Sequence, residues 1–137
     1  MNKPRIAYVG IGLMGLPMVR RLLALGYAVR VFDIAATQVE AACAAGAEAA
    51  ASAADAVTNA DLVLLNLPTP DAVEAAVFGA NGVASAIKPP QLVIDFSTIK
   101  VEQGKHHAAR LKQQTGCAWV DAPVSGGRLP RAAARSP

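Results

Sequence analysis

The chain has 137 residues, which is enough for one domain with a buried core. Hydrophobic residues make up 53% of it, but thirty are alanine, and the longest uncharged stretch near the start is interrupted by three glycines and a proline, which argues against a membrane-spanning segment. The net charge of +3 comes entirely from Arg128, Arg131 and Arg135, because residues 1–127 carry ten basic and ten acidic groups. A body without net charge argues against nucleic-acid binding.

Residues 6–9 form a short apolar run without helical periodicity, which is typical of a parallel strand buried on both faces. The next six residues, Gly10-Ile11-Gly12-Leu13-Met14-Gly15, have the G-x-G-x-x-G spacing of a dinucleotide-binding turn. Gly10 allows the tight turn, Gly12 lets the backbone approach a pyrophosphate, and Gly15 lets the following helix lie close to the sheet. The spacing alone also occurs by chance, so the prediction depends on the elements around it.

The elements around the turn are those of a dinucleotide-binding unit, with a strand before it and a helix and a second strand after it. Residues 16–25 have the apolar spacing of an amphipathic helix, with Pro17 placed in the first turn, and residues 28–32 read as a second strand. Asp33 ends that strand, where the ribose 2′-OH of a dinucleotide needs an acceptor. A carboxylate there repels a 2′-phosphate, and no arginine follows in residues 34–36, so NAD is favoured over NADP. The alternative is an acid that only caps the end of the strand.

Strands and helices alternate through the remainder of the chain. Further strands are predicted at about 48–49, 61–67, 92–96 and 118–121, and further helices at about 37–45, 52–59, 71–78 and 101–115. Capping boxes are predicted at 37–40 and 52–55, and Asp71 is the predicted cap of its helix. The alternation predicts a Rossmann-type doubly wound parallel sheet of about six strands over residues 1–127, with helices on both faces.

Ligands of such sheets bind at the carboxyl ends of the strands. Two hydroxyl-bearing segments lie there. Ser97-Thr98 could hold a nicotinamide amide or a substrate carboxylate, or could cap the helix that follows. Ser125-Gly126-Gly127 could form a nest for a carboxylate, or a plain turn.

The two histidines and the two cysteines are not expected to take part in chemistry. Adjacent residues on a helix point in different directions, so His106 and His107 are interpreted as surface residues. Cys43 and Cys117 lack metal-ligand spacing and are interpreted as free, buried or half-buried thiols of a cytoplasmic protein. No metal is expected.

Three motifs occur in a fixed order: GIGLMGLPM at 10–18, DFSTI at 95–99 and DAPVSGG at 121–127. Together they resemble the β-hydroxyacid dehydrogenase family, which includes 3-hydroxyisobutyrate dehydrogenase, tartronate semialdehyde reductase and, more distantly, 6-phosphogluconate dehydrogenase. The likeness covers residues 4–127. The glycine turn fits many dehydrogenases, whereas DAPVSGG is specific to this group.

The resemblance implies an NAD cofactor and assigns residues to it. In the family the first motif holds the dinucleotide, a Leu-Pro pair lines the path from adenosine to nicotinamide, and the threonine of the Ser-Thr pair lies near the nicotinamide. These positions and Asp33 give the following expected cofactor-binding residues: Gly10, Ile11, Gly12, Leu13, Met14, Gly15, Asp33, Leu67, Pro68 and Thr98. The substrate carboxylate is expected at Ser125, Gly126 and Gly127, which match the family's substrate-binding segment.

The reaction implied by the resemblance is the NAD-dependent oxidation of a small 3-hydroxy acid to its semialdehyde. Family members continue into a helix that carries a catalytic lysine and then a helical domain, whereas no lysine follows Lys112 here and residues 128–137 form a basic, irregular tail. We therefore expect a truncated or frameshifted family member with weak activity or none, and the alternative is a non-catalytic NAD-binding module. No nucleic-acid or membrane partner is expected, and self-association is left open.

Overall fold

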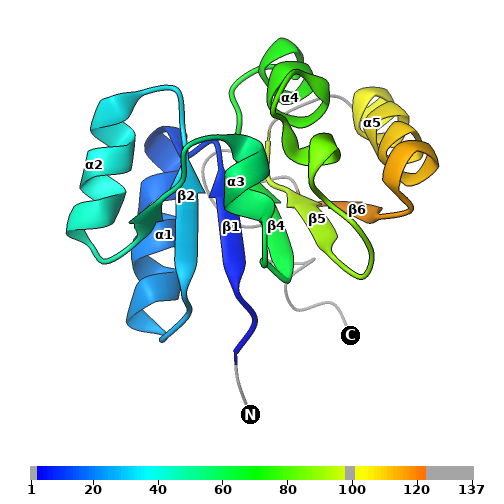
Figure 1. Cartoon of the computed structure of the whole chain (residues 1–137). Helices are drawn as coiled ribbons and strands as arrows, with labels where there is room; N and C mark the ends of the chain where they lie inside the picture. Colours follow the sequence, from blue (N-terminus) through cyan, green and yellow to red (C-terminus); the bar gives the residue numbers. More distant parts are fainter. Residues whose placement is uncertain (1–2, 98–100, 123–137) are drawn as a thin grey trace, which may run out of the picture.

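The computed structural model describes residues 3–97 and 101–122, which form a sheet with helices on both faces (Figure 1). The strands are β1 (Ile6–Val9), β2 (Val29–Phe32), β3 (Glu48–Ala49), β4 (Leu62–Leu65), β5 (Leu92–Asp95) and β6 (Ala118–Asp121). All pairings are parallel and the order is β3-β2-β1-β4-β5-β6. This is the strand order of the doubly wound dinucleotide-binding sheet, so the predicted fold class is confirmed.

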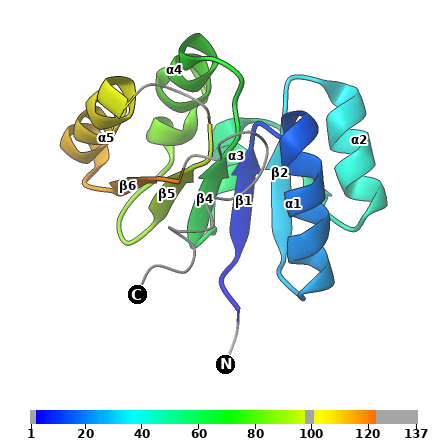
Figure 2. The same ribbon diagram turned by 180° about the vertical axis from the view of Figure 1, so that it is seen from behind.

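The helices are α1 (Gly12–Ala24), α2 (Ala36–Ala44), α3 (Ala53–Val57), α4 (Pro70–Phe78) and α5 (Val101–Thr115), with a 3₁₀ turn at Val83–Ser85. Successive side chains of a strand point to opposite faces of the sheet, so a strand covered on both faces contributes to two cores. Ile6 and Tyr8 of β1 pack in the core beneath α1 and α2, and Ala7 and Val9 pack in the core beneath α3, α4 and α5. Figure 2 shows α1 lying over the first of these faces.

Three local predictions are wrong. Helix α1 begins at Gly12, so Pro17 is its sixth residue and lies beyond the first turn. Helix α2 begins after Ala35, which has no capping side chain, so residues 37–40 do not form a capping box. Helix α4 is capped by Thr69, whose hydroxyl accepts a hydrogen bond of 3.0 Å from the Ala72 amide, because Pro70 occupies the first helical position. In α3, by contrast, Ser52 accepts from Asp55 as predicted.

The two adjacent histidines of α5 have different environments. His106 is exposed as predicted, but the prediction of a surface position for His107 is wrong, since that residue is only 5% exposed. Its ring lies 5.9 Å from the Phe78 ring and 5.6 Å from the Trp119 ring, between centroids. The cause is the packing of α5 against α4 and β6, which turns one helix face inward.

Cys43 is half-buried and Cys117 is buried, and both are free, as the sequence predicts. Within residues 3–97 and 101–122 no helix combines the length and the apolar character needed to cross a membrane.

Candidate functional site

The carboxyl ends of β1, β2, β4 and β5 meet along one edge of the sheet. Because all strands are parallel, the residues that follow them, Gly10, Asp33, Asn66 and Phe96, come together there although they are far apart in sequence. Figure 1 shows the turn from β1 into α1 at this edge. Doubly wound sheets bind their ligands at such an edge, at the point where the strand order reverses, which is here between β1 and β4.

The three glycines of the turn have distinct surroundings. Gly10 has a φ of +80°, and a Cβ added to it would lie 2.3 Å from Leu67 Cδ2. Gly12 has a φ of +56°, and its added Cβ would meet nothing closer than the Asn66 carbonyl oxygen at 3.8 Å, so the space above it is open. An added Cβ on Gly15 would lie 3.0 Å from the Tyr8 ring, which confirms the expected close packing of α1 on the sheet.

The carboxylate of Asp33 lies on this turn. Asp33 Oδ2 accepts hydrogen bonds from the amides of Ile11, at 2.7 Å, and Gly12, at 3.2 Å, while Oδ1 accepts from the Ala35 amide at 2.8 Å. The first helical bond of α1 runs from the Gly15 amide to the Ile11 carbonyl, so the amides just before Gly15 have no acceptor within the helix, as is usual at a helix N-terminus. The partial positive charge of a helix N-terminus favours an oxyanion at that position. In this structure the oxyanion is the carboxylate of Asp33.

The turn has two features that fit the pyrophosphate of a dinucleotide. The turn amides already hold a carboxylate, and the open space above Gly12 allows a larger anion to approach the backbone. The turn is therefore an oxyanion site in this structure, with open space beside Gly12. Met14, which follows in the first turn of α1, is 50% exposed.

Three further residues support the turn and were missed in the sequence. The side-chain amide of Gln38 donates to the Gly12 carbonyl from α2. Tyr8 is buried beneath Gly15, and burial raises the pKa of its hydroxyl, an effect opposed by a hydrogen bond with the Asn66 side chain. The hydrogen bonds of Gln38 with Gly12 and of Asn66 with Tyr8 join different elements, so no local pattern in the sequence predicts them.

The ends of β4 and β5 are joined by side chains. The Leu67 amide donates to Ser97 Oγ at 2.8 Å, and the Ser97 amide donates to Asp95 Oδ1 at 2.8 Å. Ser97 is only 3% exposed, and its hydroxyl binds a backbone amide of the protein. The sequence predicted either ligand binding or helix capping for Ser97-Thr98, and this bond is neither. Burial raises the pKa of Asp95, hydrogen bonds from Ser97 oppose the shift, and the nearby charge of Asp121 adds to it.

Of the predicted site residues, Gly10, Ile11, Gly12, Gly15, Asp33 and Leu67 are brought together at this edge. Pro68 is exposed beside Leu67, and Leu13 lies in the first turn of α1. Thr98, Ser125, Gly126 and Gly127 lie outside the described residues.

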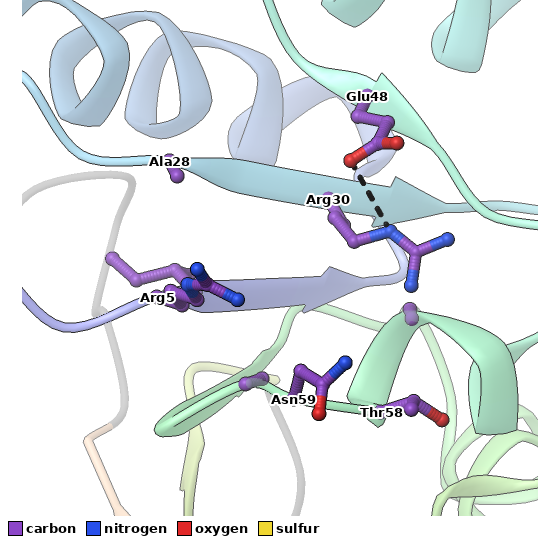
Figure 3. Close-up of a pocket in the computed structure, with 9 residues that line it drawn as sticks. Arg5, Ala28, Arg30, Glu48, Thr58 and Asn59 are labelled. Carbon is purple, nitrogen blue, oxygen red and sulfur yellow. Dashed lines mark ion pairs between the residues drawn. The ribbon is translucent and has the colours of Figure 1, made fainter.

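A hollow of about 430 Å³ lies at the opposite edge, at the amino ends of β1 and β2 (Figure 3). Its most prominent charged group, Arg30, is already paired, with Nε 3.5 Å from Glu48 and Nη2 3.0 Å from Asp55. These ion pairs join β2, β3 and α3, so we interpret Arg30 as structural. Among the described residues, no group of three or more His, Cys, Asp or Glu side chains could hold a metal ion.

The strand order and the glycine turn together define a dinucleotide-binding domain. The family model of the NAD binding domain of 6-phosphogluconate dehydrogenase matches residues 5–136. The chain belongs to this family, and NAD is its cofactor.

Known relatives agree with this assignment. The chain is 44% identical over 131 residues to the NAD-dependent L-serine dehydrogenase of Pseudomonas aeruginosa, covering 94% of this chain and 43% of the relative. It is 41% identical over 129 residues to a probable 3-hydroxyisobutyrate dehydrogenase of Mycobacterium tuberculosis, covering 94% and 42%. A solved structure of the M. tuberculosis 3-hydroxyisobutyrate dehydrogenase with L-serine superposes with a TM-score of 0.83 at 38% identity, covering 92% and 42%. The chain thus spans less than half the length of these relatives.

Proposed function

We propose that this chain forms the cofactor-binding part of an NAD-dependent dehydrogenase that oxidises a small 3-hydroxy acid to its semialdehyde. The observation that carries the proposal is the glycine turn, whose Ile11 and Gly12 amides already bind a carboxylate beside open space. NAD⁺, when bound, supplies the hydride acceptor at C4 of its nicotinamide ring. The names of the relatives support the substrate class, because L-serine and 3-hydroxyisobutyrate are both 3-hydroxy acids.

The proposed roles follow the order of the sheet edge. The turn from Gly10 to Gly15, with Ile11, Leu13 and Met14 between its glycines, would hold the pyrophosphate, and Asp33 would accept hydrogen bonds from the adenosine ribose. Leu67, Pro68 and Thr98 would lie along the path toward the nicotinamide. The substrate carboxylate would be held by Ser125, Gly126 and Gly127.

Oxidation of a hydroxyl also requires a base for its proton, commonly worth about 10²–10⁴-fold in rate. At the described part of the carboxyl edge, Asp95 is 1% exposed, Asp33 is engaged with the turn, and Asp121 Oδ1 accepts a hydrogen bond of 3.0 Å from Trp119 Nε1. Lys112 lies in the last turn of α5, toward the amino end of β6. We therefore propose that the base comes from outside the described residues.

The second candidate is a non-catalytic NAD-binding module, favoured by the same lack of a base among the described residues. Calorimetry of the purified chain with NAD⁺ and NADH, combined with assays on 3-hydroxyisobutyrate and L-serine, distinguishes the two. Binding with turnover supports the dehydrogenase, and binding without turnover supports the module. A folded chain that binds neither NAD⁺ nor NADH at millimolar concentration would overturn both.

A further inference from the structure

We infer that Asp95 is a positioning residue for the cofactor site, acting through Ser97 to hold the Leu67 backbone against the glycine turn. The inference rests on the proposed function, since it concerns the same edge of the sheet. Neither Asp95 nor Ser97 is proposed to touch the cofactor.

Asp95 is a charged residue at a buried position. It ends β5 with only 1% of its surface exposed, and its Oδ2 atom has no hydrogen-bond partner among residues 3–97 and 101–122. The neighbouring residue in the strand register, Asp121, carries the same charge. A buried carboxylate beside a second carboxylate costs stability, so a purely structural role would be better served by an uncharged side chain. The hydrogen bonding of Asp95 with Ser97, which includes the Ser97 amide, therefore indicates its role.

Ser97 continues the pairing of β4 and β5 beyond the regular ladder. The last backbone bond between these strands runs from the Phe96 amide to the Leu65 carbonyl, at 2.8 Å. Past that point the Ser97 hydroxyl accepts the Leu67 amide, also at 2.8 Å, across thirty residues of sequence. The orientation of Ser97, which Asp95 holds by its amide, thus decides where the Leu67 backbone lies.

Leu67 connects Ser97 to the glycine turn. Its side chain fills the space beside Gly10 so closely that an added Cβ there would lie 2.3 Å from Leu67 Cδ2 and 2.6 Å from Cγ. A displacement of Leu67 would therefore change both the turn and the segment that follows β4. The relay from Asp95 through Ser97 and Leu67 to Gly10 crosses three adjacent strand ends, β5, β4 and β1.

The test compares NAD⁺ affinities of variants by calorimetry, at a temperature where circular dichroism shows each to be folded. Asp95→Asn keeps the acceptor oxygen for the Ser97 amide, and we expect its affinity to stay within about twofold of the unmodified chain. Asp95→Ala and Ser97→Ala each break the relay, and we expect each to weaken binding by roughly five- to tenfold. The double variant should bind no more weakly than either single one, because both act on one path.

Val93→Ala is the matched control. Val93 is fully buried in the same strand, two residues before Asp95, and packs in the core beneath α3, α4 and α5. It should lose stability without losing NAD⁺ affinity, whereas a merely structural Asp95 would make the two variants alike.

Unchanged affinity in Asp95→Ala, an equal loss in Val93→Ala, a loss in Asp95→Asn as large as in Asp95→Ala, or additive losses in the double variant would each overturn the inference. If Asp95→Ala does not fold, unchanged affinity in Ser97→Ala suffices to overturn it. If the unmodified folded chain binds no NAD⁺, the proposed function itself fails, and this inference fails with it.

Discussion

Asp33 and Ile11 are joined by a hydrogen bond of 2.7 Å, from the Ile11 amide to Asp33 Oδ2, although twenty-two residues separate them in the sequence. The same oxygen accepts the Gly12 amide at 3.2 Å. The residue predicted to recognise the ribose therefore also stabilises the turn predicted to hold the pyrophosphate. The site is organised as an oxyanion site before any ligand arrives, which lowers the cost of ordering it on binding.

Replacing Asp33 by alanine should weaken NAD⁺ binding by roughly 10- to 100-fold, because hydrogen bonds to a charged group contribute about 1.5–3 kcal/mol. Binding of NADP⁺ should weaken less, since the carboxylate that repels a 2′-phosphate is gone. Calorimetry with both dinucleotides measures the ratio. Asp71→Ala, which removes an exposed carboxylate from the first turn of α4, is the control. An unchanged preference for NAD⁺ over NADP⁺ in Asp33→Ala would contradict the assignment.

Replacing Gly12 by alanine tests the approach of the pyrophosphate to the backbone. A side chain at φ +56° costs about 1–2 kcal/mol of stability, and its methyl group would enter the open space above the turn. We expect roughly tenfold weaker NAD⁺ binding in addition to that loss, as estimated for the loss of a charge-assisted hydrogen bond. Gly46→Ala is the matched control, since Gly46 also has a positive φ, of +118°, and an added Cβ would lie 4.0 Å from its nearest neighbours. Chemical denaturation of both variants measures the loss of stability, and calorimetry measures the affinity for NAD⁺. If Gly12→Ala and Gly46→Ala bind NAD⁺ equally well, that result argues against a pyrophosphate at the turn.

Replacing Gly10 by alanine should lower the free energy of unfolding by at least about 2 kcal/mol, because backbone strain adds to a clash with Leu67. The clash involves the end of a side chain, Leu67 Cδ2 at 2.3 Å, so removing that side chain should relieve it. In a double-mutant cycle, Gly10→Ala combined with Leu67→Ala should therefore lose less stability than the sum of the single variants. Urea denaturation measures all four proteins. Additive losses would mean that the two residues do not share a contact.

The stability of the fold should depend on pH through His107. Burial lowers its pKa below the ordinary 6.5, Glu74 and Asp121 oppose this shift, and His106 and Arg110 reinforce it. The unfolded chain therefore binds this proton more readily than the folded chain as the pH falls below about 6.5, so the free energy of unfolding should decrease in that range. Denaturation at pH 5.5 and 7.5 measures the difference.

His107→Phe keeps an aromatic ring between Phe78 and Trp119 and should remove this part of the pH dependence. His106→Gln is the control. His106 is exposed, so this variant should keep the pH dependence of stability. Equal slopes of stability against pH in the unmodified chain and in His107→Phe would show that the buried imidazole does not titrate as argued.

Local patterns in the sequence predict most of the fold. The apolar run at 6–9, the turn from Gly10 to Gly15 and the alternation of strands with helices depend on backbone conformation and residue spacing. The structure has the elements where these patterns place them, down to the two-residue strand Glu48–Ala49. Helix starts were less predictable, because Thr69 and Asp71 are both good caps. The structure has Thr69 as the cap, in agreement with the preference of proline for the first helical position, which Pro70 occupies.

The sequence by itself therefore determined the class of fold, the dinucleotide turn and the edge at which a ligand would bind, since each follows from short-range conformational preferences. Only the tertiary structure decided that Asp33 lies on Ile11 and Gly12, that Ser97 supports Leu67 and that His107 is buried. These contacts join residues from different strands and helices. They form when the sheet brings the strand ends together, and no spacing along the chain encodes that distance.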